Sequence, residues 1–129
     1  MNMAILEFDL KNLSRIYWVG LDDYDGKEYI VVKNFNLPPG YNHSEITVLL
    51  ALPDHYPEAA PGVGRSKVYV PSNLRYNGKQ PTDFHPEFGL TKDLAWWCYE
   101  TIAWDAVNDT LITFFELLRA HMTNPPTKG

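Results

Sequence analysis

The Asp25-Gly26 pair restricts the fold of this chain more than any other feature of its sequence. Asp-Gly between apolar segments is one of the strongest two-residue hairpin signals, because both residues tolerate the left-handed backbone of a tight turn. Residues 16–19 (Ile-Tyr-Trp-Val) precede the pair and residues 29–32 (Tyr-Ile-Val-Val) follow it. β-Branched and aromatic residues of this kind are enriched in strands. We therefore expect a β-hairpin in the N-terminal third.

Two more strands are predicted downstream. Residues 46–52 are apolar almost throughout and β-branched at their start, which is typical of a central strand covered on both faces. Residues 66–70 form a shorter candidate of the same composition. Four strands in succession predict an antiparallel meander. Residues 1–13 fit both an alternating strand and a short helix, and the pattern does not decide between them.

The second half begins with residues 71–92, which are rich in Pro, Gly, Asn and Asp and predict a long irregular loop. Apolar residues then recur every three or four positions from 107 to 122, which predicts one long amphipathic helix, with Asn108 or Asp105 as its N-cap. Prolines end this helix, and residues 123–129 are expected to be a flexible tail. Strands followed by a helix indicate an α+β fold, in a single domain over residues 1–129.

Composition excludes several classes of function. Eleven Lys and Arg against sixteen Asp and Glu give a net charge of −5, which does not favour nucleic acid as a partner. The apolar runs, of about six to eight residues, are much shorter than the roughly 20 that cross a bilayer, and no leader opens the chain, so we expect no membrane association. A single cysteine, with no zinc-finger spacing, predicts no disulfide, metal or cofactor. A cytoplasmic protein is expected.

Cys98, between the predicted loop and the predicted helix, is the one candidate nucleophile with a strong intrinsic reactivity. A lone cysteine is more often an inert buried residue, and that alternative stays open. Of the four histidines, His43 and His55 fall in turns and His121 is interpreted as a surface or capping residue of the helix. Only His85 shares the long loop that leads to Cys98. A cysteine hydrolase, with a histidine bonded to Cys98, is a further alternative.

Residues 52–61 (Leu-Pro-Asp-His-Tyr-Pro-Glu-Ala-Ala-Pro) resemble the turn of ubiquitin-conjugating enzymes, in which a strand runs into Pro-x-x-Tyr-Pro and then another proline. Proline withholds a backbone donor, so the chain must leave the sheet there. In that family a His-Pro-Asn element, the catalytic cysteine, a tryptophan, a helix and a proline-rich stop follow. This chain has the corresponding series in the same order: His85-Pro86-Glu87, Cys98, Trp104, residues 107–122 and Asn124-Pro125-Pro126.

The resemblance covers residues 16–126. It is greatest to the divergent bacterial ubiquitin-conjugating-like families, in which an Asp-Thr-Leu helix start such as Asp109-Thr110-Leu111 follows a Trp-rich approach to the active site. It implies a ubiquitin-conjugating-like fold with a four-stranded meander, an active-site loop and one helix. Because the sequence ends after the first proline-rich turn, this would be a minimal form that lacks the later helices.

The resemblance also implies a reaction. Cys98 would accept the C-terminus of a ubiquitin-like protein, as a thioester, from an adenylating activating enzyme and pass it to an amine of a protein or peptide. Glu100 or Asp105 would help to deprotonate that amine, and His85 would orient the loop. The groove for the modifier's tail would be shaped by three aromatic residues, Trp97, Tyr99 and Trp104.

One position departs from the family pattern. Glu87 stands where the family carries an asparagine that supports the oxyanion, and a carboxylate would oppose developing negative charge. Asn73 or Asn77 is a conceivable replacement. The alternative function is a catalytically inactive relative that binds a ubiquitin-like protein or a partner enzyme.

Overall fold

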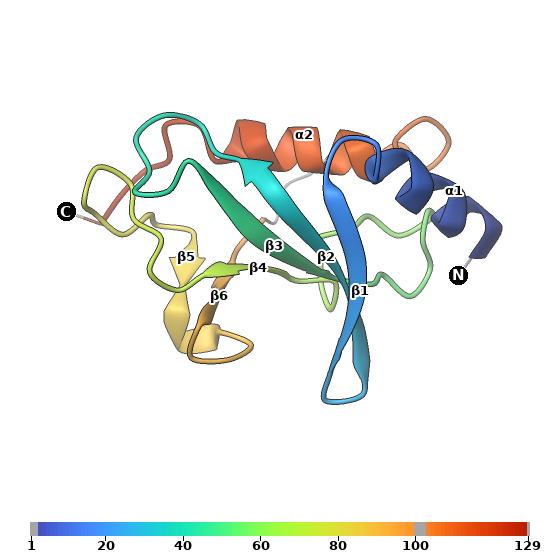
Figure 1. Cartoon of the computed structure of the whole chain (residues 1–129), viewed down its shortest axis with the longest axis horizontal. Helices are drawn as coiled ribbons and strands as arrows, with labels where there is room; N and C mark the ends of the chain where they lie inside the picture. The colour runs from blue at the N-terminus through green and yellow to red at the C-terminus, as the bar shows by residue number, and fades with distance from the viewer. Residues whose placement is uncertain (1–2, 100–102, 129) are drawn as a thin grey trace.

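A six-stranded antiparallel sheet forms the centre of the protein, in the order β1-β2-β3-β4-β6-β5. The computed structural model describes residues 3–99 and 103–128. Helix α2 lies across one face of the sheet and α1 lies at the same side near β1 (Figure 1). The expected α+β class is therefore confirmed. The elements are α1 (Met3–Leu13), β1 (Trp18–Tyr24), β2 (Lys27–Asn36), β3 (Glu45–Ala51), β4 (Val68–Pro71), β5 (Phe84–His85), the short 3-10 helix η1 (Pro86–Phe88), β6 (Leu94–Trp97) and α2 (Leu111–His121).

The hairpin of β1 and β2 forms as predicted. Its last cross-strand pair is Tyr24 with Lys27, so Asp25 and Gly26 are the two turn residues. Both have positive φ, of 53° and 75°. This is the backbone of a type I′ turn, whose twist matches the twist of the strands that it joins.

Strand β3 is buried on both faces, as its apolar sequence predicts. Leu50 faces a large core beneath the two helices, whereas Leu49 faces a second, smaller cluster on the other side of the sheet. The second cluster is built on Tyr29, Leu49, Ala51 and Tyr69. Strand β4 follows β3 in the sheet as expected, although it begins at Val68 instead of Ser66.

The expectation of four strands and one irregular loop is wrong for part of residues 71–92. Within that segment lie β5 and η1, and β6 follows it, so that the sheet has six strands. Strand β5 has only two residues and β6 has four, which is too short for a hydrophobic period to show in the sequence. Their extended backbone depends on pairing with neighbouring strands, and sequence pattern alone does not reveal that pairing.

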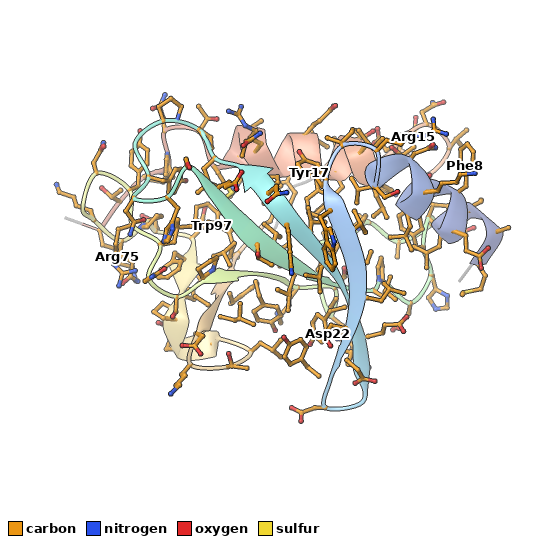
Figure 2. The ribbon with its side chains drawn as sticks, in the orientation of Figure 1. Phe8, Arg15, Tyr17, Asp22, Arg75 and Trp97 are labelled. Atoms are coloured by element: carbon orange, nitrogen blue, oxygen red, sulfur yellow. The ribbon has the colours of Figure 1, made fainter. Side chains whose placement is uncertain are left out.

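The ambiguous segment 1–13 is helical from Met3 to Leu13. Leu6, Asp9 and Leu13 are buried at three- and four-residue spacing, so one side of α1 packs on the protein. Phe8, at 63% exposure, lies on the other side (Figure 2), and Met3 in the first turn is 58% exposed. The described residues therefore form two α-helices where the sequence pattern predicts one.

Helix α2 begins later than predicted, at Leu111. Its N-cap is Thr110, whose side chain accepts from the Thr113 backbone while Thr113 reciprocates, instead of Asn108 or Asp105. Four buried residues, Leu111, Phe114, Phe115 and Leu118, pack the helix onto the sheet. Within the part of the chain that the structure describes, neither helix is long and apolar enough to cross a membrane.

Candidate active site

Cys98 follows directly after β6 and is half-buried. Strand β5 pairs with β6 through Phe84 with Trp97 and His85 with Trp96. The Cys98 amide continues this ladder by donating a hydrogen bond of 2.8 Å to the Asp83 carbonyl. The sheet thus fixes the backbone of the cysteine while leaving its side chain partly accessible.

The two tryptophans before Cys98 lie on opposite faces of the sheet, because side chains alternate along a strand. Trp97 is fully buried in the core on the α2 side (Figure 2), where its Nε1 donates to His121 Nδ1 at 3.0 Å. Trp96 is half-buried and packs with the outer cluster. Trp97 was expected to shape a groove at the surface. It lies instead in the core beneath the cysteine segment.

A hollow of about 310 Å³ lies beside the cysteine segment. Its lining is Gly62, Val63, Gly64, Lys67, Trp96 and Tyr99. Gly62 has φ of +81°, and a Cβ there would come within 2.8 Å of Phe114 Cε1. Gly62 therefore packs so closely on Phe114 of α2 that the position has no room for a side chain.

Trp96 and Lys67 are parts of this site that the sequence interpretation missed. The Lys67 Nζ lies 4.1 Å from the Trp96 ring centroid, a cation–π contact that fixes both side chains on the wall of the hollow. The alternation of Trp96 with Trp97 was the available signal, since it places one of the two on each face of a strand. Tyr99, which the sequence did single out, lines the hollow and is otherwise buried.

His85 lies in β5 and pairs with Trp96 of β6, so the structure brings it beside the strand that leads into Cys98. Its ring centroid is 5.2 Å from that of Trp96, and its Nδ1 lies 3.2 Å from Glu87 Oε1. A hydrogen bond from its own backbone amide and one from His85 hold the pKa of Glu87 below its ordinary value. Glu87 is thus an anionic partner of His85.

His121 has more contacts around the cysteine than its position in a helix indicates. Its Nδ1 accepts from Trp97, its Nε2 lies 3.5 Å from Asp83 Oδ2, and its ring centroid is 4.7 Å from that of Tyr99. Burial lowers the pKa of His121, and the Asp83 carboxylate opposes that effect. The interpretation of His121 as a surface or capping residue is therefore wrong. Sequence carried no signal for it, because Asp83 and His121 are distant along the chain.

Two other predicted residues lie in the segment that leads into α2. Asp105 closes a turn, because its carboxylate accepts hydrogen bonds from the Val107 and Asn108 amides and from the Asn108 side chain. These bonds hold the pKa of Asp105 below its ordinary value, and the bond from the Asn108 side chain has the largest effect. The Trp104 Nε1 donates to the Pro57 carbonyl at 2.7 Å. Trp104 therefore packs on the Tyr-Pro turn. Glu100 lies outside the described residues.

The Tyr-Pro turn is tied to α1 by a buried hydrogen bond. The Tyr56 hydroxyl donates to Asp9 Oδ2, and both residues are at most 5% exposed. Burial, and then the bond to Asp9, raise the pKa of Tyr56 far above its ordinary value. The peptide bond between Tyr56 and Pro57 is cis. The turn is thereby held to the first helix as well as to the sheet.

The two asparagines considered as oxyanion donors both lie in the segment between β4 and β5. The Asn73 side chain lies 3.0 Å from His43 Nε2, and Asn77 has φ of 50° in the turn that it forms with Gly78. Among the described residues, His, Cys, Asp and Glu form no group of three or more that could hold a metal ion.

The sheet, the Tyr-Pro turn, the cysteine after the last paired strand and the covering helix define a ubiquitin-conjugating-like class of protein. A sequence model of the family described as "Prokaryotic E2 family E" matches residues 6–124, and the chain belongs to that family. Membership indicates an E2-like conjugating function, with a ubiquitin-like protein and an activating enzyme as general partners. No curated protein and no solved structure gives a significant match to the chain.

Proposed function

We propose that this chain is a ubiquitin-like-protein conjugating enzyme that carries the modifier as a thioester on Cys98. The observation that carries the proposal is the position of Cys98, which is half-buried, follows a paired strand and lies in the chain between Trp96 and Tyr99, two residues that line the hollow. A nucleophile on a fixed backbone beside a narrow hollow suits acyl transfer from an extended peptide terminus.

The reaction has two acyl transfers. In the first, the Cys98 thiolate attacks the carbonyl carbon of the modifier's C-terminal thioester, and the thiolate of the activating enzyme's cysteine leaves. In the second, an acceptor amine attacks the same carbon and Cys98 leaves as a thiolate. The amine loses one proton to a base, for which Glu100 and Asp105 are the proposed groups. His85 would orient the β5 side of the site through Trp96.

The hollow provides a place for the modifier's tail. A tail of small residues suits the side of the hollow where Gly64 carries no side chain, and Tyr99 and Trp96 offer aromatic surface beside it. Trp97 and Trp104 would support the site without lining the hollow. The indole of Trp97 donates a hydrogen bond to His121, and that of Trp104 donates one to the Pro57 carbonyl. This hollow favours a modifier whose tail ends in glycine.

Helix α1 is the proposed contact for the activating enzyme. The first helix docks that enzyme in the family that the chain resembles, and here it exposes Phe8 on its outer side (Figure 2) and Met3 in its first turn. Large apolar side chains left exposed are typical of protein contacts.

A synthetic peptide ending in Gly-Gly, presented as the thioester of mercaptoethanesulfonate, tests the first transfer without other proteins. We expect intact mass to show that one peptide is added to the wild-type chain and that dithiothreitol removes it. The rate of this transfer should exceed the rate of transfer to free glutathione. Cys98→Ser should give at most an ester that resists the reductant, and Cys98→Ala should give none. Modification no faster than that of glutathione would contradict the proposal.

The inactive binding module remains the second candidate, and the Glu87 carboxylate favours it. Glu87 occupies the place where the family pattern has a neutral donor, and its lowered pKa keeps it anionic at neutral pH. This candidate predicts a native Cys98 that resists iodoacetamide, whereas the conjugating enzyme requires alkylation without denaturant.

A further inference from the structure

Three contacts of His121 converge on the segment that carries Cys98. Its ring meets Trp97, the residue before the cysteine, and Tyr99, the residue after it. It also meets the side chain of Asp83, whose carbonyl accepts the Cys98 amide. One side chain at the end of α2 therefore contacts both neighbours of the cysteine and the residue that pairs with it.

The hydrogen bond from Trp97 fixes the tautomer of His121. An indole Nε1–H only donates, so His121 Nδ1 must be the acceptor and carry no proton. The proton of the neutral ring is then on Nε2, which lies 3.5 Å from Asp83 Oδ2. A second proton on Nδ1 would place two N–H groups against each other. Protonation of His121 and its bond to Trp97 are thus mutually exclusive.

We propose that His121, oriented by Asp83, is a positioning residue for Cys98: in its neutral form it anchors the cysteine segment through Trp97, and its protonation releases that anchor. The inference rests on the proposed function for its consequence, which is that acyl transfer onto Cys98 needs neutral His121. It goes beyond that function by assigning a role to a residue that does not itself touch the reacting atoms.

The groups that face His121 determine the sign of its response to pH. Asp83 favours the protonated ring, while burial favours the neutral ring and has the larger effect. Tyr99, the other titratable side chain found against the ring, stays neutral because burial raises its pKa. His121 is 30% exposed, so a proton can reach it from solvent without unfolding. The anchor is therefore intact at neutral pH and is lost on the acid side.

Two substitutions of His121 separate the bond from the titration. His121→Asn keeps a side-chain oxygen near the position of Nδ1 and does not titrate, whereas His121→Leu removes the acceptor. Trp97→Phe removes the donor and serves as an independent route to the same loss if His121→Leu fails to fold. Circular dichroism and the urea midpoint establish that each variant is folded.

The main readout is the rate at which iodoacetamide alkylates Cys98 between pH 5 and pH 8.5, divided by the thiolate fraction. For the wild type we expect a step in this corrected rate on the acid side of neutrality, because release of the anchor changes the exposure of the sulfur. His121→Asn should show the wild-type rate at pH 8 and no step. His121→Leu and Trp97→Phe should already show the acid-side rate at pH 8.

The peptide thioester gives the second readout. Transfer at pH 8 should fall about tenfold in His121→Leu and Trp97→Phe, as expected for loss of one positioning hydrogen bond, and be retained in His121→Asn. If the wild type and His121→Asn give superimposable alkylation profiles, or His121→Leu reacts as the wild type does, the inference is overturned. If alkylation behaves as expected but the wild type accepts no peptide, the positioning role stands and the proposed function fails.

Discussion

The two ends of α2 are attached to the rest of the protein in different ways. At its first turn, near the Thr110 cap, the hydroxyl of Tyr56 lies between Asp9 and the Leu111 amide, in a fully buried arrangement. At its last turn, His121 is partly open to solvent and bonds to Trp97. The first end is closed to water, whereas the last end lies beside the candidate nucleophile.

The buried bond of Tyr56 to Asp9 therefore serves stability, whereas the bond of Trp97 to His121 can respond to pH. A buried hydrogen bond to a carboxylate is expensive to lose, since either partner left alone remains desolvated. A half-exposed imidazole can take a proton and find water instead, so breaking its bond changes the local geometry at little cost to the fold. The end of the helix beside Cys98 is thus the end that is adjustable.

The largest expected effect is at the buried end. Tyr56→Phe removes the hydroxyl that donates to Asp9 and should lower the free energy of unfolding by about 3 kcal/mol, because the carboxylate stays buried without that donor. Urea denaturation measures this. The matched control is Tyr76→Phe, whose hydroxyl bonds to Asn124 at an exposed site and should cost less than about 1 kcal/mol. Equal losses in both variants would contradict the argument that burial makes the bond at the first end of α2 costly to lose.

A second prediction concerns Gly62 and Gly64, two residues that line the hollow. Gly62 and Gly64 both have positive φ, so alanine at either position should cost about 1–2 kcal/mol. Only at Gly62 would the new Cβ also meet Phe114 of α2, which should add roughly another 1 kcal/mol of overpacking. Urea midpoints compare the two, and the peptide thioester shows whether Gly62→Ala alone slows transfer. A greater loss for Gly64→Ala would contradict the packing described at Gly62.

The smallest effect on stability is expected at His121. Because its pKa is lowered in the folded state, the unfolded chain binds more protons, and the contribution of His121 to stability falls as the pH drops below the ordinary value of 6.5. The urea midpoint of the wild type should therefore fall more between pH 8 and pH 5.5 than that of His121→Asn. Other histidines titrate in both proteins and cancel in the difference. A larger fall in the variant would reverse the assigned sign.

Much of the fold could be predicted because its main signals are local. The hairpin at Asp25-Gly26 and the apolar strand β3 follow from a turn preference and from composition over a few residues. The family resemblance came from the Tyr-Pro turn and the order of later motifs, and the match over residues 6–124 confirms it. The short strands β5 and β6 could not be predicted in this way, because they exist only through their pairing.

The candidate site was less predictable for a related reason. Residue type and neighbourhood singled out Cys98 and Tyr99, and of these Tyr99 lines the hollow. Asp83 and His121 come together only when β5 pairs with β6 and α2 lies over the sheet. A histidine on an amphipathic helix gives no indication of such a partner, so its position requires the three-dimensional structure.

The outer rims of the sheet also have a consequence for how the protein behaves at high concentration. Strand β1 pairs on one side only and presents Asp22 and Asp23 near its hairpin turn, where Figure 2 labels Asp22. Joining two copies antiparallel at the hairpin end of this strand would bring like charges together, and β5 at the opposite rim has only two residues to offer. Neither rim is a good template for a growing ribbon of strands. Crowded molecules should therefore stay separate, with the cysteine end of each one left clear for a partner.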